Sequence, residues 1–201
     1  AADKVILMSG TIIDHKMFAD TLGIEKYDYL EVESEFDPKH SPIYCLDKFK
    51  LNYKTMDKVL PKVVDIAEHT FKITKALQTK FRKDKRFLTR EPGVTNEYLL
   101  EKHRLSDQST VIMSPSLGFG TDLSDDFGRF SIVMKAPYLP MGDKRIKTLM
   151  ERSFRWYQMK ALVNLVQMED YSDTYILDAT ATELIKKNVD KLPKYFRDRL
   201  V

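Results

Sequence analysis

Short apolar runs that alternate with helix-like segments are the feature that most constrains the fold of this 201-residue chain. Strand-like runs occur at 5–8, 29–32, 43–46, 87–89, 110–113, 130–135 and 174–177, and helical patterns at 14–22, 55–68, 70–81, 95–103, 143–151, 154–168 and from Thr180 and Pro193 onward. Strands separated by helices of about 10 to 15 residues are typical of a mostly parallel sheet with helices on both faces. We therefore expect one three-layer α/β domain over residues 1–201, because the length suits a single domain.

Local signals set the bounds of several elements. We expect Asp14 to cap a helix that Gly23 stops, and the T-A-T-E sequence from Thr180 to Glu183 to act as a capping box. The run from Val5 to Met8 is expected to be a buried strand followed by a turn at Ser9, Gly10 and Thr11.

Composition excludes several classes of protein. With 43% hydrophobic and 31% charged residues the chain is neither disordered nor fibrous. Charges interrupt every run before the ~18 apolar residues that a membrane span needs, so we expect no membrane partner. The single cysteine, Cys45, forms no internal disulfide and suits a reducing compartment, and the first residues lack a secretory signal. A cytoplasmic protein is expected.

The charge is unevenly distributed along the chain. The net charge of +3 is too small to indicate nucleic-acid binding by itself. However, 72–86 holds seven basic residues and one acid, whereas 25–37 holds six acids and one lysine. Residues 143–160 are again mostly basic and include Phe154, Trp156 and Tyr157, a mixture that single-stranded nucleic acid exploits. The alternative is that these runs are solvated helix faces whose aromatic side chains point inward.

No self-sufficient catalytic motif is present. There is no G-x-x-x-x-G-K-[ST] sequence, and the four histidines lack metal-ligand spacing, so we expect them to be surface or hydrogen-bonding residues. Cys45 is expected to be a packed thiol rather than a nucleophile. Asp122, Asp125 and Asp126 suit either a magnesium site or, as we favour, turns and caps. In parallel sheets ligands gather at the carboxyl ends of strands, which directs attention to the loops after Met8, Met113, Lys135 and Leu177.

Several blocks, in order, resemble a known family. V-I-L-M-S-G-T-I at 5–12 looks like the S-A-T or S-G-T motif of superfamily 2 helicases. The sequence T-V-I-M-S-P-S-L-G-F-G-T-D-L-S-D-D-F-G-R-F, followed by an apolar run ending K-A-P-Y, resembles motif V and the next strand of DNA helicases of the DinG and XPD type. S-P-I-Y, H-T-F-K, L-V-Q and E-D-Y-S-D-T-Y-I-L-D match further landmarks, so the resemblance covers nearly the whole chain.

The resemblance implies the second, C-terminal RecA-like domain of an ATP-dependent DNA helicase, carrying motifs III to VI. Its partners would be single-stranded DNA and an N-terminal RecA-like domain that holds most of the ATP and Mg²⁺ site, and the resemblance also allows an iron–sulfur cluster elsewhere in a full-length protein. A bacterial or phage-type protein is favoured.

The resemblance also implies roles for individual residues. The catalytic positions would be Gln167, Asp122 and Gly120. Ser9, Gly10 and Thr11 would couple the nucleotide cleft to movement. The contacts to the nucleic-acid backbone would come from Thr70, Lys72, Lys75, Ser114 and Ser116. For Ser114 and Ser116 the alternative is simple turn capping around Pro115.

Three departures from the family pattern qualify this reading. Gln167 should open Q-x-x-G-R-x-x-R, but here it runs directly into M-E-D-Y, and no apolar strand precedes H-T-F-K. We favour the interpretation that residues of the natural protein are left out of the 201-residue sequence at both gaps, and the alternative is natural degeneration of the two motifs. Phe119 stands where the family has Glu. The alternative function is a non-catalytic nucleic-acid-binding α/β module, which the missing P-loop and arginines also suit.

Overall fold

The computed structural model describes residues 4–33, 37–50, 79, 83–90, 93–114, 123, 125–167 and 172–201. The predicted helices at 55–68 and 70–81 lie outside this part of the chain, apart from Thr79. The statements below concern the described residues.

The main sheet has three parallel strands, β1 (Ile43–Phe49), β5 (Asp173–Asp178) and β4 (Phe130–Val133), in the order β1-β5-β4. Ile43 pairs with Thr174, and Val133 pairs with Ile176. A second, two-stranded parallel sheet joins β2 (Phe87–Thr89) to β3 (Val111–Met113). The expected α/β class with a mostly parallel sheet is confirmed, and the architecture is compatible with a three-layer RecA-like fold.

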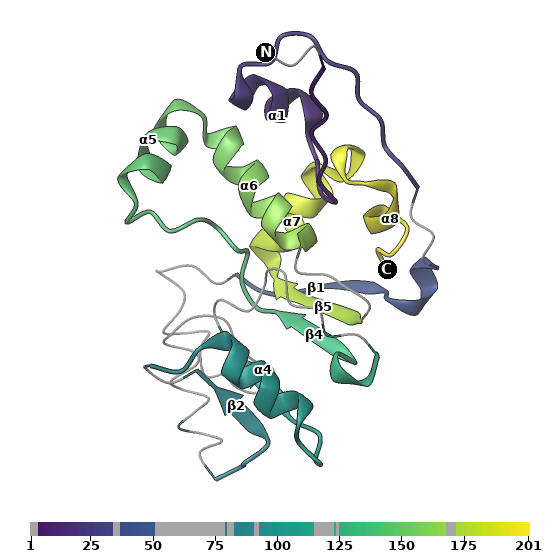
Figure 1. Ribbon diagram of the computed structural model, residues 1–201, viewed down its shortest axis with the longest axis vertical. Coiled ribbons are helices and arrows are strands. Elements are labelled where there is room, and N and C mark those ends of the chain that lie inside the picture. Colours follow the sequence, from purple (N-terminus) through teal and green to yellow (C-terminus); the bar gives the residue numbers. More distant parts are fainter. Residues whose placement is uncertain are drawn as a thin grey trace.

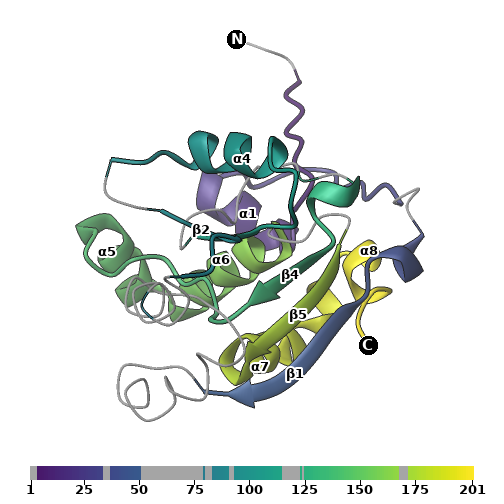
Figure 2. The ribbon, with the colours of Figure 1, turned by 90° about the horizontal axis from the view of Figure 1, so that it is seen from below.

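The helices lie on both sides of the main sheet. Figure 1 shows α1 (His15–Leu22), α6 (Phe154–Gln167), α7 (Ala179–Lys187) and α8 (Lys194–Arg197) above it, and α4 (Asn96–Arg104) with β2 below it. Figure 2, seen from below, shows β1, β5 and β4 side by side. Helix α5 (Lys144–Arg152) packs on α6 at one end of the molecule, and short 3₁₀ helices lie at Pro38–His40 (η1), Asp125–Phe127 (η2) and Val189–Lys191 (η3). No helix in the described ranges is both long and apolar enough to cross a membrane.

The core lies between the main sheet and the helices above it. It joins side chains of all three strands to α6, α7, α8 and residues near α1, among them Ile43, Val133, Ile176, Leu162 and Phe196. Cys45 packs against this core, as predicted, and is partly buried. This contact between the main sheet and the helices above it is the expected source of most of the fold's stability.

Two predicted strands at the N-terminal end are wrong. Val5–Met8 is not a strand, and its four side chains are 48–89% exposed. Tyr29–Val32 is also not a strand, and Leu30 and Val32 are exposed. A strand needs a neighbour to satisfy its backbone groups, and no described segment pairs with either run.

Of the predicted helix caps, those of α1 are confirmed and the capping box of α7 is wrong. Asp14 accepts a hydrogen bond from the Met17 amide at 2.9 Å, and Gly23 ends α1 with a φ of 71°, as predicted. The predicted capping box at Thr180 is wrong, because Asp178 caps α7 and the helix begins at Ala179. Asp178 takes the N-cap position instead of Thr180 because Asp178 ends the central strand β5, where its carboxylate accepts a hydrogen bond from the Thr180 amide.

Candidate functional site at the carboxyl edge of the sheet

The carboxyl ends of the three parallel strands form one edge of the main sheet. Phe49 pairs with Asp178, and Val133 pairs with Ile176 two residues before Asp178, so the ends lie side by side. The segment Met134–Pro137 follows β4 directly at this edge. This is the edge at which open parallel sheets bind ligands.

The side chain of Asp178 joins two segments at this edge by hydrogen bonds. Its side chain is buried, and the residue is only 1% exposed. Oδ2 accepts a hydrogen bond from the Ala136 amide at 2.8 Å, and Oδ1 accepts one from the Thr180 amide at 3.1 Å. One carboxylate therefore both caps α7 and holds the segment after β4, which lies 42 positions away in the chain.

Lys135 is a cation on the segment Met134–Pro137, which Asp178 binds through the Ala136 amide. It lies between Met134 and Ala136, which are 0% and 3% exposed, whereas Lys135 is half-buried. No ion pair joins Lys135 to another described residue. An ammonium on a fixed backbone at the carboxyl edge of a parallel sheet suits a phosphate group.

The rest of this segment packs along α6. The Tyr157 hydroxyl donates to the Leu139 carbonyl at 2.7 Å, and Asn164 Nδ2 donates to the Pro137 carbonyl at 3.1 Å. Tyr138 stacks on Tyr157 with ring centroids 5.1 Å apart. Burial, together with Tyr157 and the charge of Asp178, raises the pKa of the Tyr138 phenol, so that this side chain stays neutral.

Gln167 is the one predicted catalytic position that lies within the described residues. It is the last residue of α6 and lies about one turn, or ~4.5 Å along the helix axis, beyond Asn164, which binds Pro137. Its side chain is exposed. Gly120 and Asp122, the other two predicted catalytic positions, lie outside the described residues.

The predicted coupling residues Ser9, Gly10 and Thr11 form a turn elsewhere. The Thr11 amide donates to Ser9 Oγ at 3.1 Å, and the Tyr195 hydroxyl of α8 donates to the Gly10 carbonyl at 3.5 Å. In the described contacts this turn lies against α8 and not against Asp178 or the segment after β4.

Ser114 lies at the end of the small sheet. It directly follows β3, and its hydroxyl donates to Asn96 Oδ1 of α4 at 3.3 Å. His103 of α4 bonds the Phe127 carbonyl at 2.8 Å through Nε2 and Thr110 through Nδ1, and so ties α4 to η2. His103 is thereby a hydrogen-bonding histidine, as predicted.

The remaining predicted nucleic-acid contacts, Thr70, Lys72, Lys75 and Ser116, lie outside the described residues. Of the three clustered aspartates, Asp125 begins η2 and Asp126 pairs with Arg129 at 3.0 Å, which favours the turn interpretation. Across the described ranges, no group of three or more His, Cys, Asp or Glu is arranged to hold a metal ion.

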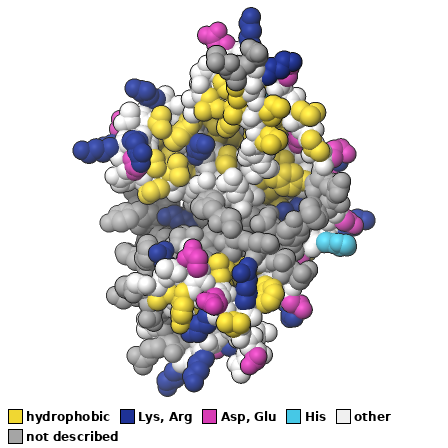
Figure 3. Space-filling model, in the orientation of Figure 1, with side chains coloured by type: hydrophobic (Ala, Val, Ile, Leu, Met, Phe, Trp, Pro, Cys, Tyr) yellow, Lys and Arg dark blue, Asp and Glu magenta, His cyan; other side chains and the backbone are white. Residues whose placement is uncertain are grey.

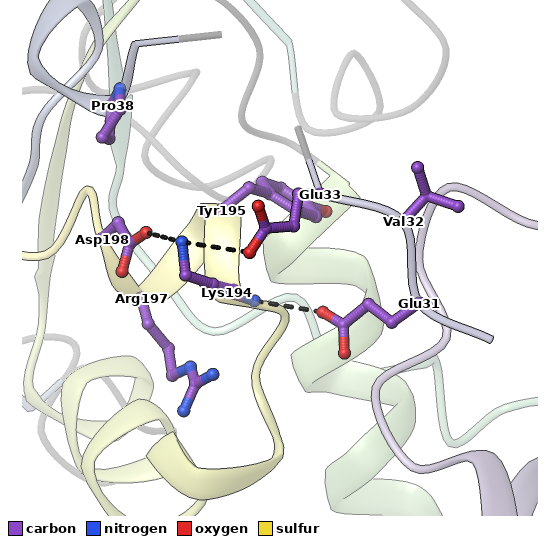
Figure 4. A pocket seen from close by; sticks show the side chains of 8 residues that line it. All are labelled: Glu31, Val32, Glu33, Pro38, Lys194, Tyr195, Arg197 and Asp198. Carbon is purple, nitrogen blue, oxygen red and sulfur yellow. Dashed lines mark hydrogen bonds and ion pairs between the residues drawn. The ribbon is translucent and has the colours of Figure 1, made fainter. Parts of the chain in front are cut away.

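A separate cavity of about 320 Å³ lies between the extended segment at Glu31–Glu33 and α8 (Figure 4). Lys194 Nζ lies 3.6 Å from Glu33 Oε1 and 3.3 Å from Asp198 Oδ2, and the Lys194 amide donates to Glu31 at 3.2 Å. Asp198 and then Glu33 raise the pKa of Lys194. These charges pair with one another, so we assign them to holding the acidic segment against α8 rather than to a ligand.

Sequence reasoning gave no role to Asp178 and Lys135, although both left a signal. Asp178 directly follows the apolar run Tyr175–Leu177 and precedes small residues, as an N-cap at a strand end does. Lys135 is the only charged residue between Arg129 and Asp143, and a lone charge in an apolar stretch needs a reason.

The comparisons with known proteins identify no relative. A scan of protein-family models finds none that matches the chain, and a search of curated proteins finds no significant match.

Proposed function

We propose that this chain is the C-terminal motor domain of an ATP-dependent DNA helicase that translocates on single-stranded DNA and unwinds duplexes. The observation that carries the proposal is the position of the long motif V-like block. It runs from Ser114 to Phe130, between β3, which ends at Met113, and β4, which begins at Phe130. The resemblance requires strands at both places.

The carboxyl edge of the main sheet supports the same proposal. Lys135 supplies a positive charge, and Asp178 holds the backbone of the residue next to it, Ala136. Gln167 supplies an exposed amide at the end of α6, the helix whose Asn164 binds the same segment. Groups positioned in this way suit the face that one RecA-like lobe turns toward a nucleotide held by the other. Nucleotide binding and hydrolysis would then close and open the cleft between the lobes and move the strand.

A magnesium ion does not fit the described residues of this edge. Both oxygens of Asp178 accept backbone hydrogen bonds, and the side chain is buried. A hard cation needs several open oxygen ligands. We therefore assign Mg²⁺ and most of the ATP contacts to the N-terminal RecA-like lobe, and this chain alone is expected to be inactive as an ATPase.

The test is the ATPase rate of the full-length protein with and without single-stranded DNA. We expect the DNA to raise the rate severalfold. A protein that binds the DNA but shows the same rate in its presence would contradict the motor and leave the non-catalytic nucleic-acid-binding module, which the missing motif VI arginines favour.

A further inference from the structure

The segment from Asp143 to Arg155, here called the α5 corner, concentrates positive charge at one end of the molecule. It holds five Lys or Arg residues against two carboxylates, a net charge equal to the +3 of the whole chain. Figure 3 shows Lys and Arg side chains gathered at the left edge of the molecule, where Figure 1 places α5. The nearly neutral chain thus carries a local cationic surface.

Helix α5 turns this charge outward. None of its nine residues is buried, and its inner side consists of the half-buried Ile146 and Met150. At 100° per residue, Lys144, Thr148 and Arg152 follow one another at intervals of one turn on the side opposite to Ile146 and Met150. All three are exposed.

Three of the five cations have no ion-pair partner within the described residues. Arg145 pairs with Asp143 at 2.8 Å, and Arg155 pairs with Asp14 at 2.9 Å. Lys144, Lys147 and Arg152 make no such pair. Their charges are available to an anionic polymer.

An aromatic ring stands beside these cations. Phe154, two residues after Arg152, is 58% exposed, whereas Tyr157 is buried and Trp156 is half-buried. Of the three aromatic residues in this basic stretch, only Phe154 offers its ring to a ligand. A phenylalanine that gains so little from burial in the fold suits stacking against an unpaired base.

We propose that the α5 corner binds single-stranded nucleic acid, with Lys144, Lys147 and Arg152 on phosphates and Phe154 stacked on a base. Cations that track the backbone and an aromatic ring that accepts any base are the two parts of sequence-independent single-strand binding. The inference rests on the proposed function for the identity of the polymer. It adds a contact surface outside the residues that the family resemblance indicates.

The test compares two triple variants of the 201-residue chain on a fluorescent single-stranded oligonucleotide. The first carries Lys144→Gln, Lys147→Gln and Arg152→Gln, and Gln preserves helix propensity. The control carries Lys16→Gln, Lys26→Gln and Lys39→Gln, which removes the same charge from three exposed lysines elsewhere. Circular dichroism is to be recorded for both variants, and binding is compared only between variants with the parental spectrum.

We expect the α5 variant to bind at least about 10-fold more weakly at 50 mM salt, and the slope of log K against log salt to become shallower by about 2. The control should bind nearly as the parent does. Phe154→Ala should lower the affinity for single strands by about 5- to 100-fold with an unchanged salt slope, and should affect duplex DNA little.

Equal losses in the two triple variants would mean that only net charge matters and would overturn the inference, as would parental affinity in the α5 variant. A parent chain that binds no single-stranded DNA at low salt would refute the nucleic-acid function itself, which separates the two failures. Binding of the parent to phosphatidylserine vesicles but not to DNA would assign the corner to a lipid surface and overturn the proposal.

Discussion

Replacing Asp178 by Asn should destabilise the fold, because it removes a buried hydrogen bond between two distant segments. The carboxylate accepts the Ala136 amide at 2.8 Å and the Thr180 amide at 3.1 Å. An Asn side chain has one acceptor oxygen and remains a good N-cap, so it keeps the bond to Thr180 and leaves the Ala136 amide facing its own NH₂ group.

The size of the effect follows from these contacts. An orphaned buried amide costs about 1–3 kcal/mol, so Asp178→Asn should lower the free energy of unfolding by that amount. Asp178→Ala also loses the cap, worth about 0.5–2 kcal/mol, and should cost about 2–5 kcal/mol in all. For a chain of this size, each kcal/mol corresponds to a fall in Tm of about 2–4 °C.

Urea denaturation of the 201-residue chain measures the loss as a lower midpoint with an unchanged slope. Asp143→Asn is the control, because Asp143 also caps a helix by accepting a backbone amide, and within the described residues its side-chain hydrogen bonds go to nearby Arg145. Its midpoint should fall less than that of Asp178→Asn, because no buried backbone amide loses its partner there. Hydrogen exchange of the Ala136 amide should accelerate in Asp178→Asn alone.

Equal midpoints for Asp178→Asn and Asp143→Asn would refute the reasoning, because only the first substitution leaves the buried Ala136 amide without its carboxylate partner. Unchanged exchange at the Ala136 amide would refute it independently of the stability measurement.

Three further predictions concern single residues. Lys135→Met in the full-length protein should lower DNA-stimulated ATPase by about 10-fold or more while urea stability stays within about 0.5 kcal/mol, and parental activity would remove Lys135 from the site. Gly23→Ala should cost about 1–2 kcal/mol in urea denaturation, because φ is 71° at the end of α1; an unchanged midpoint would contradict this. The hydrogen bonds and charge of Arg145 lower the pKa of Asp143 from 3.8 to about 2. The stabilising contribution of the Asp143 carboxylate is therefore present above pH 3.8 and lost as the pH falls through about 2. Carboxyl NMR should show this lowered pKa, and Arg145→Gln should return the pKa of Asp143 toward 3.8.

The helices were largely predictable because their bounds depend on near neighbours. Asp14 caps α1 through an amide three residues away, and Thr95 caps α4 through the Tyr98 amide in the same way. The expected strand at Phe87–Thr89 is also confirmed. Patterns of this length are complete within the sequence.

The candidate site was only partly predictable, because its residues meet through the sheet. The sequence pointed to the loop after Lys135, which follows β4 at the carboxyl edge of the main sheet. Its other expectation, Gln167, stays a prediction, and the residue is the last one of α6. The sequence assigned no role to Asp178, since its bond to Ala136 joins strands that are neighbours only in the folded chain. Ser9–Thr11 were expected near the cleft, but the described contacts place them against α8.

By itself, the sequence determined the α/β class, most helix bounds and the order of the motif-like blocks, since periodicity, caps and turns act over a few residues. Only the tertiary structure decided that Val5–Met8 stays exposed without a strand partner, that β2 and β3 pair apart from the main sheet, and that Lys144, Lys147 and Arg152 face outward. Strand pairing and charge pairing depend on which distant segments the core brings together, and that choice is made by burial over the whole chain.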